Sequence, residues 1–297
     1  MKTIKIVLIG LLFFSWSNNG SCQSVAAGQV MDNLIVKSKI LNKDVHYAIY
    51  LPSDYNTSNR SYPVVYLLHG YTDDQAGWIQ FGEINMSVDR AIAERRIPPM
   101  IIVMPDAGVS WYINDSKNTY RYEDMFFQEF IPYIESNYRI RAKKEFRGVC
   151  GLSMGGFGSF VYALHHPDMF VASAPLSAAV YNADDFITMP DERYNNVFAK
   201  IFGEGLKGDA RITDFWKKNN VPELMKNMPE SQKNAVKFYI DCGDDDFLSR
   251  DNCLLHVLML DNKIPHEFRV RDGVHNWTYW RTGIIDALDF IGQNFHR

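Results

Sequence analysis

The sequence lacks a concentrated run of basic residues. Lysine and arginine occur no more than two in a row, and acidic residues outnumber basic ones by 35 to 31, which gives a formal net charge of −4. A protein that follows a nucleic-acid backbone needs a basic face to neutralise phosphates. We therefore expect no nucleic acid among the partners of this chain.

An apolar run long enough to span a membrane is also missing. The N-terminal apolar stretch, Ile6 to Trp16, is shorter than the ~20 residues that a transmembrane helix needs. Lys2 and Lys5 precede it and the polar segment "SNNGSCQS" follows it, which is typical of a secretory signal peptide. We predict that residues 1–22 are removed, that the protein is exported to the periplasm or secreted, and that it has no transmembrane anchor.

Cysteine is scarce, at four residues. Cys22 lies at the predicted cleavage site and could instead carry a lipid anchor, so both kinds of processing stay open. Cys150, Cys242 and Cys253 remain, and an odd number leaves at least one thiol unpaired or joined to another molecule. The pairing stays open, and buried thiols also serve as small apolar side chains. No Cys-x-x-Cys pair indicates zinc or redox chemistry, and we expect no metal site.

Internal repeats and linkers rich in proline, glycine and serine are absent as well. Residues 23–297 therefore form one predicted domain. Within it, residues 181–235 are rich in asparagine, lysine and proline and show no strand pattern. They are predicted to form a small cap-like insertion, although an ordinary surface insertion without a substrate role fits the same pattern.

What the sequence does contain is an alternation of apolar strand patterns with amphipathic helix patterns. Two early strands joined by a hairpin are followed by alternating helices and buried strands, which predicts an α/β fold with a mostly parallel central sheet and helices on both faces. The expected strands are 33–41, 45–52, 62–70, 98–108, 145–153, 171–180, 236–243 and 266–273. The expected helices are 87–96, 122–138, 155–166, 252–260 and 278–295.

The segment "GVCGLSMGGFGSF", residues 148–160, holds one serine between glycines at a junction from strand to helix. Gly151, Ser153 and Gly155 fit the G-x-S-x-G elbow, which presents a nucleophilic serine on a sharp turn. A glycine-rich bend without chemistry fits the same five residues. The partners of Ser153 therefore have to decide between the two interpretations.

A serine hydroxyl needs a base, and the base needs an orienting acid. Functional loops of a parallel sheet follow the carboxyl ends of its strands. His275, in "RDGVHNW", follows a predicted strand, whereas His256, His266 and His296 lie in a helix, at a strand start and at the terminus. The acid falls within "DCGDDDFLSRDN", where the candidates are Asp244, Asp245 and Asp246. The order serine, aspartate, histidine is that of the α/β-hydrolases.

Catalysis by such a serine also requires donors for the negative charge of the tetrahedral intermediate. The elbow supplies the backbone N–H of Met154, and the loop after "LLHG" supplies that of Tyr71. His69 ends a buried strand, where a structural hydrogen bond is the expected role.

Five segments together resemble one family: "LLHGYTDDQAGW", "YEDMFFQEFIPYIESNYRI", "GLSMGGFGSF", "DCGDDDFLSRDN" and "VHNWTYW". They are similar to the esterase D-like branch of the α/β-hydrolases, which contains the feruloyl and acetylxylan esterases of carbohydrate esterase family 1, tributyrin-esterase-like enzymes and S-formylglutathione hydrolases. The resemblance covers residues 45–295. It implies Asp246 as the acid, His275 as the base with Val274 in place of the usual glycine, Tyr71 as an oxyanion donor, and an acyl pocket near Trp111 and Trp277.

These observations predict a secreted serine carboxylic ester hydrolase that forms an acyl-enzyme and uses no cofactor. The resemblance and the predicted export together favour feruloyl or acetyl esters of plant polysaccharides such as xylan. A general short-chain acyl esterase is the alternative, and a non-catalytic carbohydrate-binding protein is a third interpretation, whose signature would be a broken triad. The sequence does not determine the oligomeric state.

Overall fold

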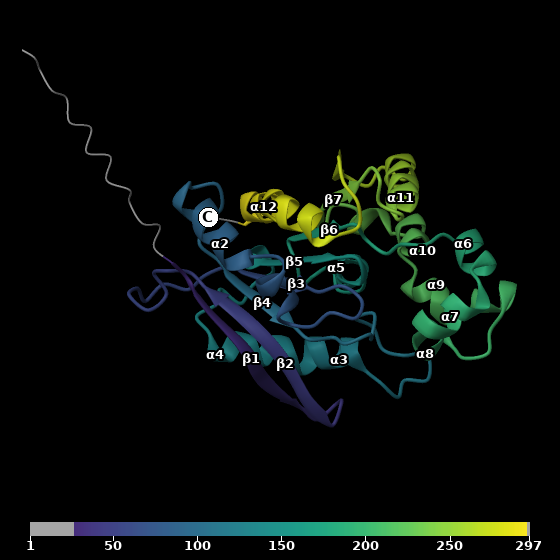
Figure 1. Cartoon of the computed structure of the whole chain (residues 1–297), viewed down its shortest axis with the longest axis horizontal. Coiled ribbons are helices and arrows are strands. Elements are labelled where there is room, and N and C mark those ends of the chain that lie inside the picture. The colour runs from purple at the N-terminus through teal and green to yellow at the C-terminus, as the bar shows by residue number, and fades with distance from the viewer. Residues whose placement is uncertain (1–26, 296–297) are drawn as a thin grey trace, which may run out of the picture.

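One sheet of eight strands organises the computed structural model of the chain, which describes residues 27–295 (Figure 1). The strand order is β1-β2-β4-β3-β5-β6-β7-β8. β2 pairs antiparallel with β1 and β4, and every other neighbouring pair is parallel. The predicted α/β fold with a mostly parallel sheet is confirmed. The strands are β1 (Gln29–Ser38), β2 (Lys43–Leu51), β3 (Val64–Leu68), β4 (Ile101–Pro105), β5 (Arg147–Leu152), β6 (Ala172–Leu176), β7 (Lys237–Gly243) and β8 (His266–Arg271).

Helices cover both faces of this sheet. Side chains of α1, α2 and α12 pack on one face, and those of α3, α4, α5, α10 and α11 pack on the other. The bounds are α1 (Gly77–Gln80), α2 (Ile84–Ala93), α3 (Tyr122–Met125), α4 (Ile131–Asn137), α5 (Met154–His165), α6 (Ala183–Thr188), α7 (Asp191–Val197), α8 (Ala199–Phe202), α9 (Asp214–Asn219), α10 (Val221–Lys226), α11 (Ser249–Asp261) and α12 (Trp277–Asn294). Short 3-10 helices occupy Lys144–Phe146, Gly208–Arg211 and Glu230–Gln232.

The central strands are buried on both faces, as their continuous apolar sequences require. All five residues of β3 and of β4 are buried. Along β3, Tyr66 and Leu68 belong to one hydrophobic cluster and Val65 and Leu67 to the other, because successive side chains of a strand point to opposite faces. Each fully buried leucine or valine contributes about 1.5–3 kcal/mol, so this strand anchors both layers.

The expected continuous helix over residues 122–138 is wrong in its middle. Residues Phe126–Phe130 form a π-helical turn between α3 and α4, and the Ile131 N–H donates to the carbonyl of Phe126. Pro132 follows directly. It has no N–H to continue the ladder and its ring crowds the carbonyl of residue 128, so the chain widens by one residue before the helix resumes.

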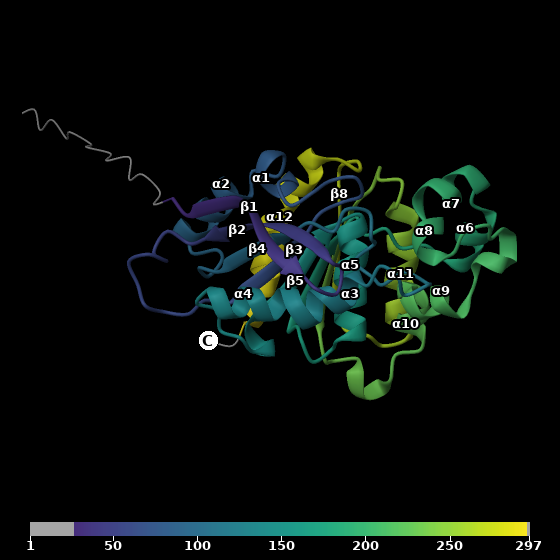
Figure 2. The same cartoon turned by 90° about the horizontal axis from the view of Figure 1, so that it is seen from below.

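Residues 181–235 contain helices α6–α10 and no strand. Figures 1 and 2 both place α6–α9 together at the end of the molecule opposite α2. Arg211 lies at the centre of this group with its side chain buried. Its guanidinium donates to the carbonyls of Phe186 and Met189 and pairs with Asp191. A charge buried in this way is tolerated because each donor is satisfied, and it ties the helices into one unit.

Within residues 27–295, no helix is both long and apolar enough to cross a membrane. The predicted signal peptide, the alternative lipid site at Cys22, and His296 lie outside the described residues. The first elements of the described part are β1 and β2, which form the predicted hairpin.

Candidate active site

Ser153 lies on the sharp turn between β5 and α5. Its backbone has φ 55° and ψ −114°, a conformation that costs an ordinary residue about 1–3 kcal/mol. The surroundings hold it there: the Ser153 N–H donates to the carbonyl of Leu176 (2.9 Å), and its own carbonyl accepts from Ala179 (3.0 Å) and Phe157 (3.0 Å). This is the geometry of a nucleophile elbow rather than of a loose glycine-rich bend.

The two glycines that flank Ser153 are required by close backbone approach. A Cβ on Gly151 would lie 2.5 Å from the carbonyl oxygen of Gly155. A Cβ on Gly155 would lie 2.5 Å from the carbonyl oxygen of Leu68 and 2.6 Å from that of His69. Helix α5 therefore begins in direct contact with the end of β3, and the spacing in G-x-S-x-G follows from this packing.

His275 lies in the loop after β8 and joins Ser153 to Asp246. The Ser153 Oγ is 2.9 Å from His275 Nε2, and His275 Nδ1 is 2.8 Å from Asp246 Oδ2. With the ring proton on Nδ1, the imidazole donates to the carboxylate and leaves Nε2 free to accept the serine proton. The structure thus brings the three predicted residues into one hydrogen-bond chain.

Asp246 is the buried member of this chain, with no exposed side-chain surface. Burial by itself would raise the pKa of Asp246, but the hydrogen bond from His275 and the N–H of Leu248 (2.8 Å to Oδ1) outweigh it and hold this pKa below its ordinary value. The carboxylate is therefore ionised at neutral pH and can stabilise an imidazolium.

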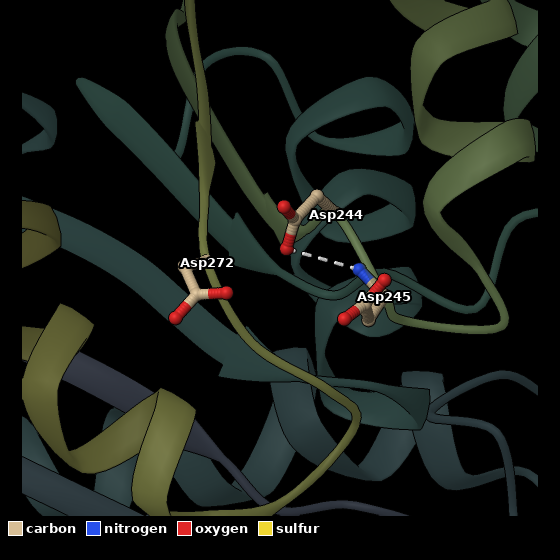
Figure 3. Close-up of side chains that lie close together, drawn as sticks. All are labelled: Asp244, Asp245 and Asp272. Atoms are coloured by element: carbon tan, nitrogen blue, oxygen red, sulfur yellow. Dashed lines mark hydrogen bonds between the residues drawn. The ribbon is translucent and has the colours of Figure 1, made fainter.

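Asp244 and Asp245, the alternative acids, are exposed, and their side chains take no part in this chain of hydrogen bonds. Asp244 Oδ1 accepts from the N–H of Gly273 (3.0 Å), which fastens the loop of His275 to the end of β7. It also accepts from the Asp245 N–H (3.1 Å), the contact drawn in Figure 3. The carboxylates of Asp244, Asp245 and Asp272 approach one another within 4.8 Å, all at the surface (Figure 3). Exposed acidic groups of this kind are common without an ion.

The predicted oxyanion donors lie on the two loops that meet at Ser153. Among the described residues, the backbone N–H groups of Tyr71 and Met154 have no acceptor within the protein. Gly70 brings the first loop close, because a Cβ placed on it would be 3.7 Å from Cβ of Ser153. Two free donors beside a nucleophile suit the negative charge of a tetrahedral intermediate.

His69 is a structural residue, in agreement with its expected role. The ring is buried, its Nδ1 is 2.7 Å from the carbonyl of Gly70, and its Nε2 accepts from the Ala107 N–H at 2.9 Å. The Tyr112 hydroxyl donates to the carbonyl of His69. These contacts align the ends of β3 and β4, and they leave neither ring nitrogen free to act as a base.

An aromatic cavity lies next to the elbow, between α5 and the 181–235 segment. It is lined by residues that include Trp111, Phe157, Tyr181, Phe186, Phe198 and Trp216. Phe157 and Ala179, both in its wall, donate to the carbonyl of Ser153, so the cavity begins within one helical turn of the nucleophile. The Trp111 indole is held by a hydrogen bond to the carbonyl of Val197 (3.1 Å).

The structure does not bring the two predicted pocket tryptophans together. Trp277 is the first residue of α12 and does not line the aromatic cavity. Its ring packs against Trp78 (5.2 Å between centroids), Phe81 (5.7 Å) and Trp280 (5.5 Å). The reason is the direction of α12, which packs on the sheet face opposite α5. A substrate contact for Trp277 stays a prediction.

Two supporting residues escaped the sequence analysis. Ser177, directly after β6, accepts from the Trp280 indole (3.0 Å), and its hydroxyl helps to lower the pKa of the Asp246 carboxyl. The Phe247 ring is 4.6 Å from the ring of His275 and is 64% exposed. Ser177 could have been found, because it follows a strand end in the same way as the other site residues.

A buried ion pair supports the acid and base loops from below. Asp241 on β7 has no solvent exposure, and its two oxygens accept from Arg271 on β8 at 2.9 Å each. The hydroxyls of Tyr239 and Tyr279 also donate hydrogen bonds to the carboxylate of Asp241, at 3.1 and 2.6 Å. A buried carboxylate with every oxygen satisfied fixes the relative position of β7, β8 and α12, and therefore of the two loops above them.

Comparison with known proteins places this site in a family. Residues 38–291 match the family model described as "Esterase: Putative esterase". The acetyl esterase of Caldicellulosiruptor saccharolyticus is 24% identical over 273 residues, which is 86% of this chain and 96% of that protein. An endo-1,4-beta-xylanase/feruloyl esterase of Xylanibacter ruminicola is 31% identical over 151 residues, or 48% of this chain and 20% of that protein.

A solved structure of a ferulic acid esterase superposes with a TM-score of 0.77 at 31% identity, covering 91% of this chain and 99% of that one. The resemblance inferred from the sequence motifs is thereby confirmed, and the non-catalytic interpretation is wrong, because the matched family model describes esterases and the triad of this chain is unbroken. The matched family model spans most of the chain, from the last residue of β1 to the last turn of α12. This protein therefore belongs to the esterase family and is a carboxylic ester hydrolase.

Proposed function

We propose that this enzyme is an exported serine esterase that cleaves acetyl or feruloyl esters of plant polysaccharides through an acyl-enzyme. The observation that carries the mechanism is the hydrogen-bond chain from Ser153 through His275 to Asp246. A histidine 2.9 Å from a serine hydroxyl, held by a buried carboxylate, is arranged for general base catalysis.

In the first half of the reaction Ser153 Oγ attacks the ester carbonyl while His275 Nε2 takes its proton. The N–H groups of Tyr71 and Met154 receive the developing oxyanion, and each such donor contributes on the order of 10²–10³ in rate. Asp246 stabilises the imidazolium. His275 then returns the proton to the leaving alcohol oxygen, and the acyl group remains on Ser153.

In the second half a water molecule occupies the position that the alcohol has left. His275 accepts its proton and the hydroxide adds to the acyl-enzyme carbonyl. When the second tetrahedral intermediate collapses, the bond to Ser153 Oγ breaks and His275 returns the proton to this oxygen, which frees the acid and restores Ser153. The proposed route involves no redox change and no bound cofactor. Its rate depends on the same two oxyanion donors.

The acyl group would enter the aromatic cavity beside the elbow. The free volume of the cavity is about 20 Å³ and the rings of Trp111 and Phe198 are buried 4.8 Å apart, so the planar ring of a phenolic acid such as ferulic acid would enter only if these two side chains moved apart. An acetyl group occupies only the part nearest Ser153. The names of the related acetyl and feruloyl esterases support both acyl groups, and the general short-chain esterase remains the alternative.

Export supports a polysaccharide as the alcohol part, because acylated xylan lies outside the cell that degrades it. The support comes from the sequence pattern of residues 1–22. Mass spectrometry of the mature N-terminus tests this part: a chain that begins near Gln23 indicates a released protein, a lipid on Cys22 indicates an anchored one, and an intact Met1 contradicts export.

A substrate panel tests the specificity. We expect turnover of methyl ferulate or acetylated xylan with a higher kcat/KM than that of a butyrate ester of a simple alcohol. Preference for butyrate with neither plant substrate turned over would favour the short-chain alternative. Trp111→Ala should lower kcat/KM for ferulate more than for acetate esters, whereas Tyr133→Ala, at an exposed aromatic residue of α4 outside the cavity, is the control.

A further inference from the structure

Strand β8 forms one edge of the sheet, and its outer side is open among residues 27–295. β7 is its neighbour on one side, and no described strand pairs with the other. Glu267, Arg269 and Val270 are exposed, and Val270 exposes 48% of its surface. Bare edges are templates for pairing with another chain, and monomeric proteins usually cover or interrupt them.

The backbone direction shows which residues of β8 offer hydrogen bonds outward. The carbonyl of Arg271 accepts from the N–H of Asp244, so the peptide groups of Arg271 face β7. Backbone groups alternate sides along a strand, and those of Glu267 and Arg269 therefore also face β7. The N–H and C=O groups of His266, Phe268 and Val270 consequently face out, and Arg269 reaches the Phe268 carbonyl from the open side (3.1 Å).

The charges on β8 are self-complementary in one antiparallel register. When Phe268 is paired with Phe268 of a second copy, the residues whose backbone groups face out on one strand lie opposite those of the other strand. Glu267 of each copy then lies opposite Arg269 of the other copy. Registers centred on Glu267 or on Arg269 set like charges opposite each other, which is destabilising. In the single chain Glu267 and Arg269 already pair with one another, at 2.5 Å. Two copies in the favoured register form a square of four alternating charges.

Helix α11 adds an exposed apolar side chain along the same edge. His256 contacts β8 through His266 (2.7 Å) and stacks on Phe268 (4.5 Å between centroids), which marks the side of α11 that faces the edge. Leu260 lies one helical turn after His256 and therefore on this side, and it exposes 57% of its surface. Exposed apolar side chains beside an unpaired strand are typical of an association surface.

We propose that β8 pairs antiparallel with β8 of a second copy of this chain, centred on Phe268, to form a symmetric dimer with one continuous sheet. The two-fold axis runs perpendicular to the sheet, so both α11 helices lie on the same face and flank the new strand pair. Both copies contribute the same surface to this interface, as closed two-fold symmetry requires. The loop of His275 begins at the end of β8, so each active site lies next to the interface.

Charge exchange tests this interface in the mature full-length protein. Size-exclusion chromatography with light scattering should give twice the chain mass for the wild type across a concentration series. Arg269→Glu leaves only acidic side chains at the two facing positions, Glu267→Arg leaves only basic ones, and each variant should be monomeric. An equimolar mixture of these two variants restores opposite charges in every facing pair and should form a heterodimer.

Lys217→Glu on α9, away from the edge, is the matched charge-reversal control and should stay dimeric. Circular dichroism and hydrolysis of a simple acetate ester check that each variant is folded, since neither Glu267 nor Arg269 contacts the active site. A wild type that is monomeric at every concentration overturns the proposal. So does a dimer that survives Arg269→Glu, or a mixture of the two variants that remains monomeric.

Discussion

His275 Nε2 lies 2.9 Å from Ser153 Oγ although 122 residues separate them in the chain. Strands β5 and β8, which precede these residues, are separated by β6 and β7 in the sheet. At about 4.8 Å per strand the loops must bridge three spacings. The loop after β8 does so because it folds back over β7, where Gly273 is tied to Asp244 and Asp245 by hydrogen bonds of 3.0 and 3.1 Å.

Removal of the nucleophile should abolish ester hydrolysis without unfolding the protein. Ser153→Ala is expected to lower kcat by ~10⁴-fold or more, because no other hydroxyl in the described part of the chain hydrogen-bonds His275 Nε2. Ser136→Ala, an exposed serine on α4, is the control and should keep wild-type rates. Steady-state kinetics on a chromogenic acetate ester measures both, and substantial turnover by the Ser153 variant refutes the proposed mechanism.

The identity of the acid is testable within the aspartate triplet. Asp246→Asn should reduce kcat by ~10³–10⁴-fold, because the amide favours the wrong histidine tautomer and provides no negative charge for the imidazolium. Asp245→Asn should change it less than ~10-fold, since its exposed side chain lies outside the hydrogen-bond chain. Equal losses in the two variants contradict the assignment. Circular dichroism of both variants excludes unfolding as the cause.

A substitution at Gly155 tests whether the close contact between α5 and the end of β3 requires a glycine at this position. In Gly155→Ala the new methyl group meets the backbone carbonyls of Leu68 and His69 at 2.5 and 2.6 Å, and neither backbone can yield without moving β3. We expect the free energy of unfolding to fall by about 1–3 kcal/mol or more. Denaturant unfolding measures this loss, with Gly205→Ala, where a Cβ meets nothing within 4 Å but φ is +75°, as the comparison for strain alone.

The contact between α5 and the 181–235 segment should depend on pH. His165 faces acceptors on both ring nitrogens: Glu123 Oε1 at 2.8 Å and the carbonyl of Lys218 at 2.9 Å. Burial alone would lower the pKa of His165, but the hydrogen bond and charge of Glu123 outweigh it and raise this pKa. His166 shares the same Glu123 oxygen, at 2.9 Å.

A raised histidine pKa gives stability that is fully present below the unfolded value of about 6.5 and is lost as pH rises through the folded pKa. The lowered pKa of Glu123 gives stability that is lost as pH falls through its own folded value. His165→Gln should therefore lower Tm most at pH 5–6 and least at alkaline pH. His256→Gln is the control, because the pKa of His256 is lowered. A Tm difference for His165→Gln that grows with pH contradicts the sign.

Asp251 on α11 and Asp185 on α6 are neighbouring carboxylates that repel each other when both are ionised. Burial, followed by the hydrogen bond and charge of Asp185, raises the pKa of Asp251 to about 7. Its proton is therefore held more tightly in the folded protein, so ionisation costs stability as pH rises from about 4 to 7. Asp251→Asn should stabilise the protein by about 1 kcal/mol at pH 8 and by little at pH 4, after allowance for partial solvent screening. Thermal melts across this pH range measure the change, and a stabilisation independent of pH contradicts it.

Much of the fold follows from local sequence patterns. Period-two and continuous apolar runs predicted the strands, and the helices α5, α11 and α12 begin within about three residues of their expected positions. The break at Phe126–Phe130 was missed because the apolar spacing continues across Pro132, although the backbone hydrogen bonds cannot.

The sequence by itself determined the chemical types and their order: a serine on a turn, an acidic triplet, and a histidine after the last strand. These features are local, because turns and strand ends depend on neighbouring residues. Only the tertiary structure decided that Asp246 is buried against His275, that His69 has no free nitrogen, that Trp111 and not Trp277 lines the cavity, and that β8 is an open edge. Each of these depends on which strands become neighbours and which face a helix covers, and those contacts join residues far apart in the chain.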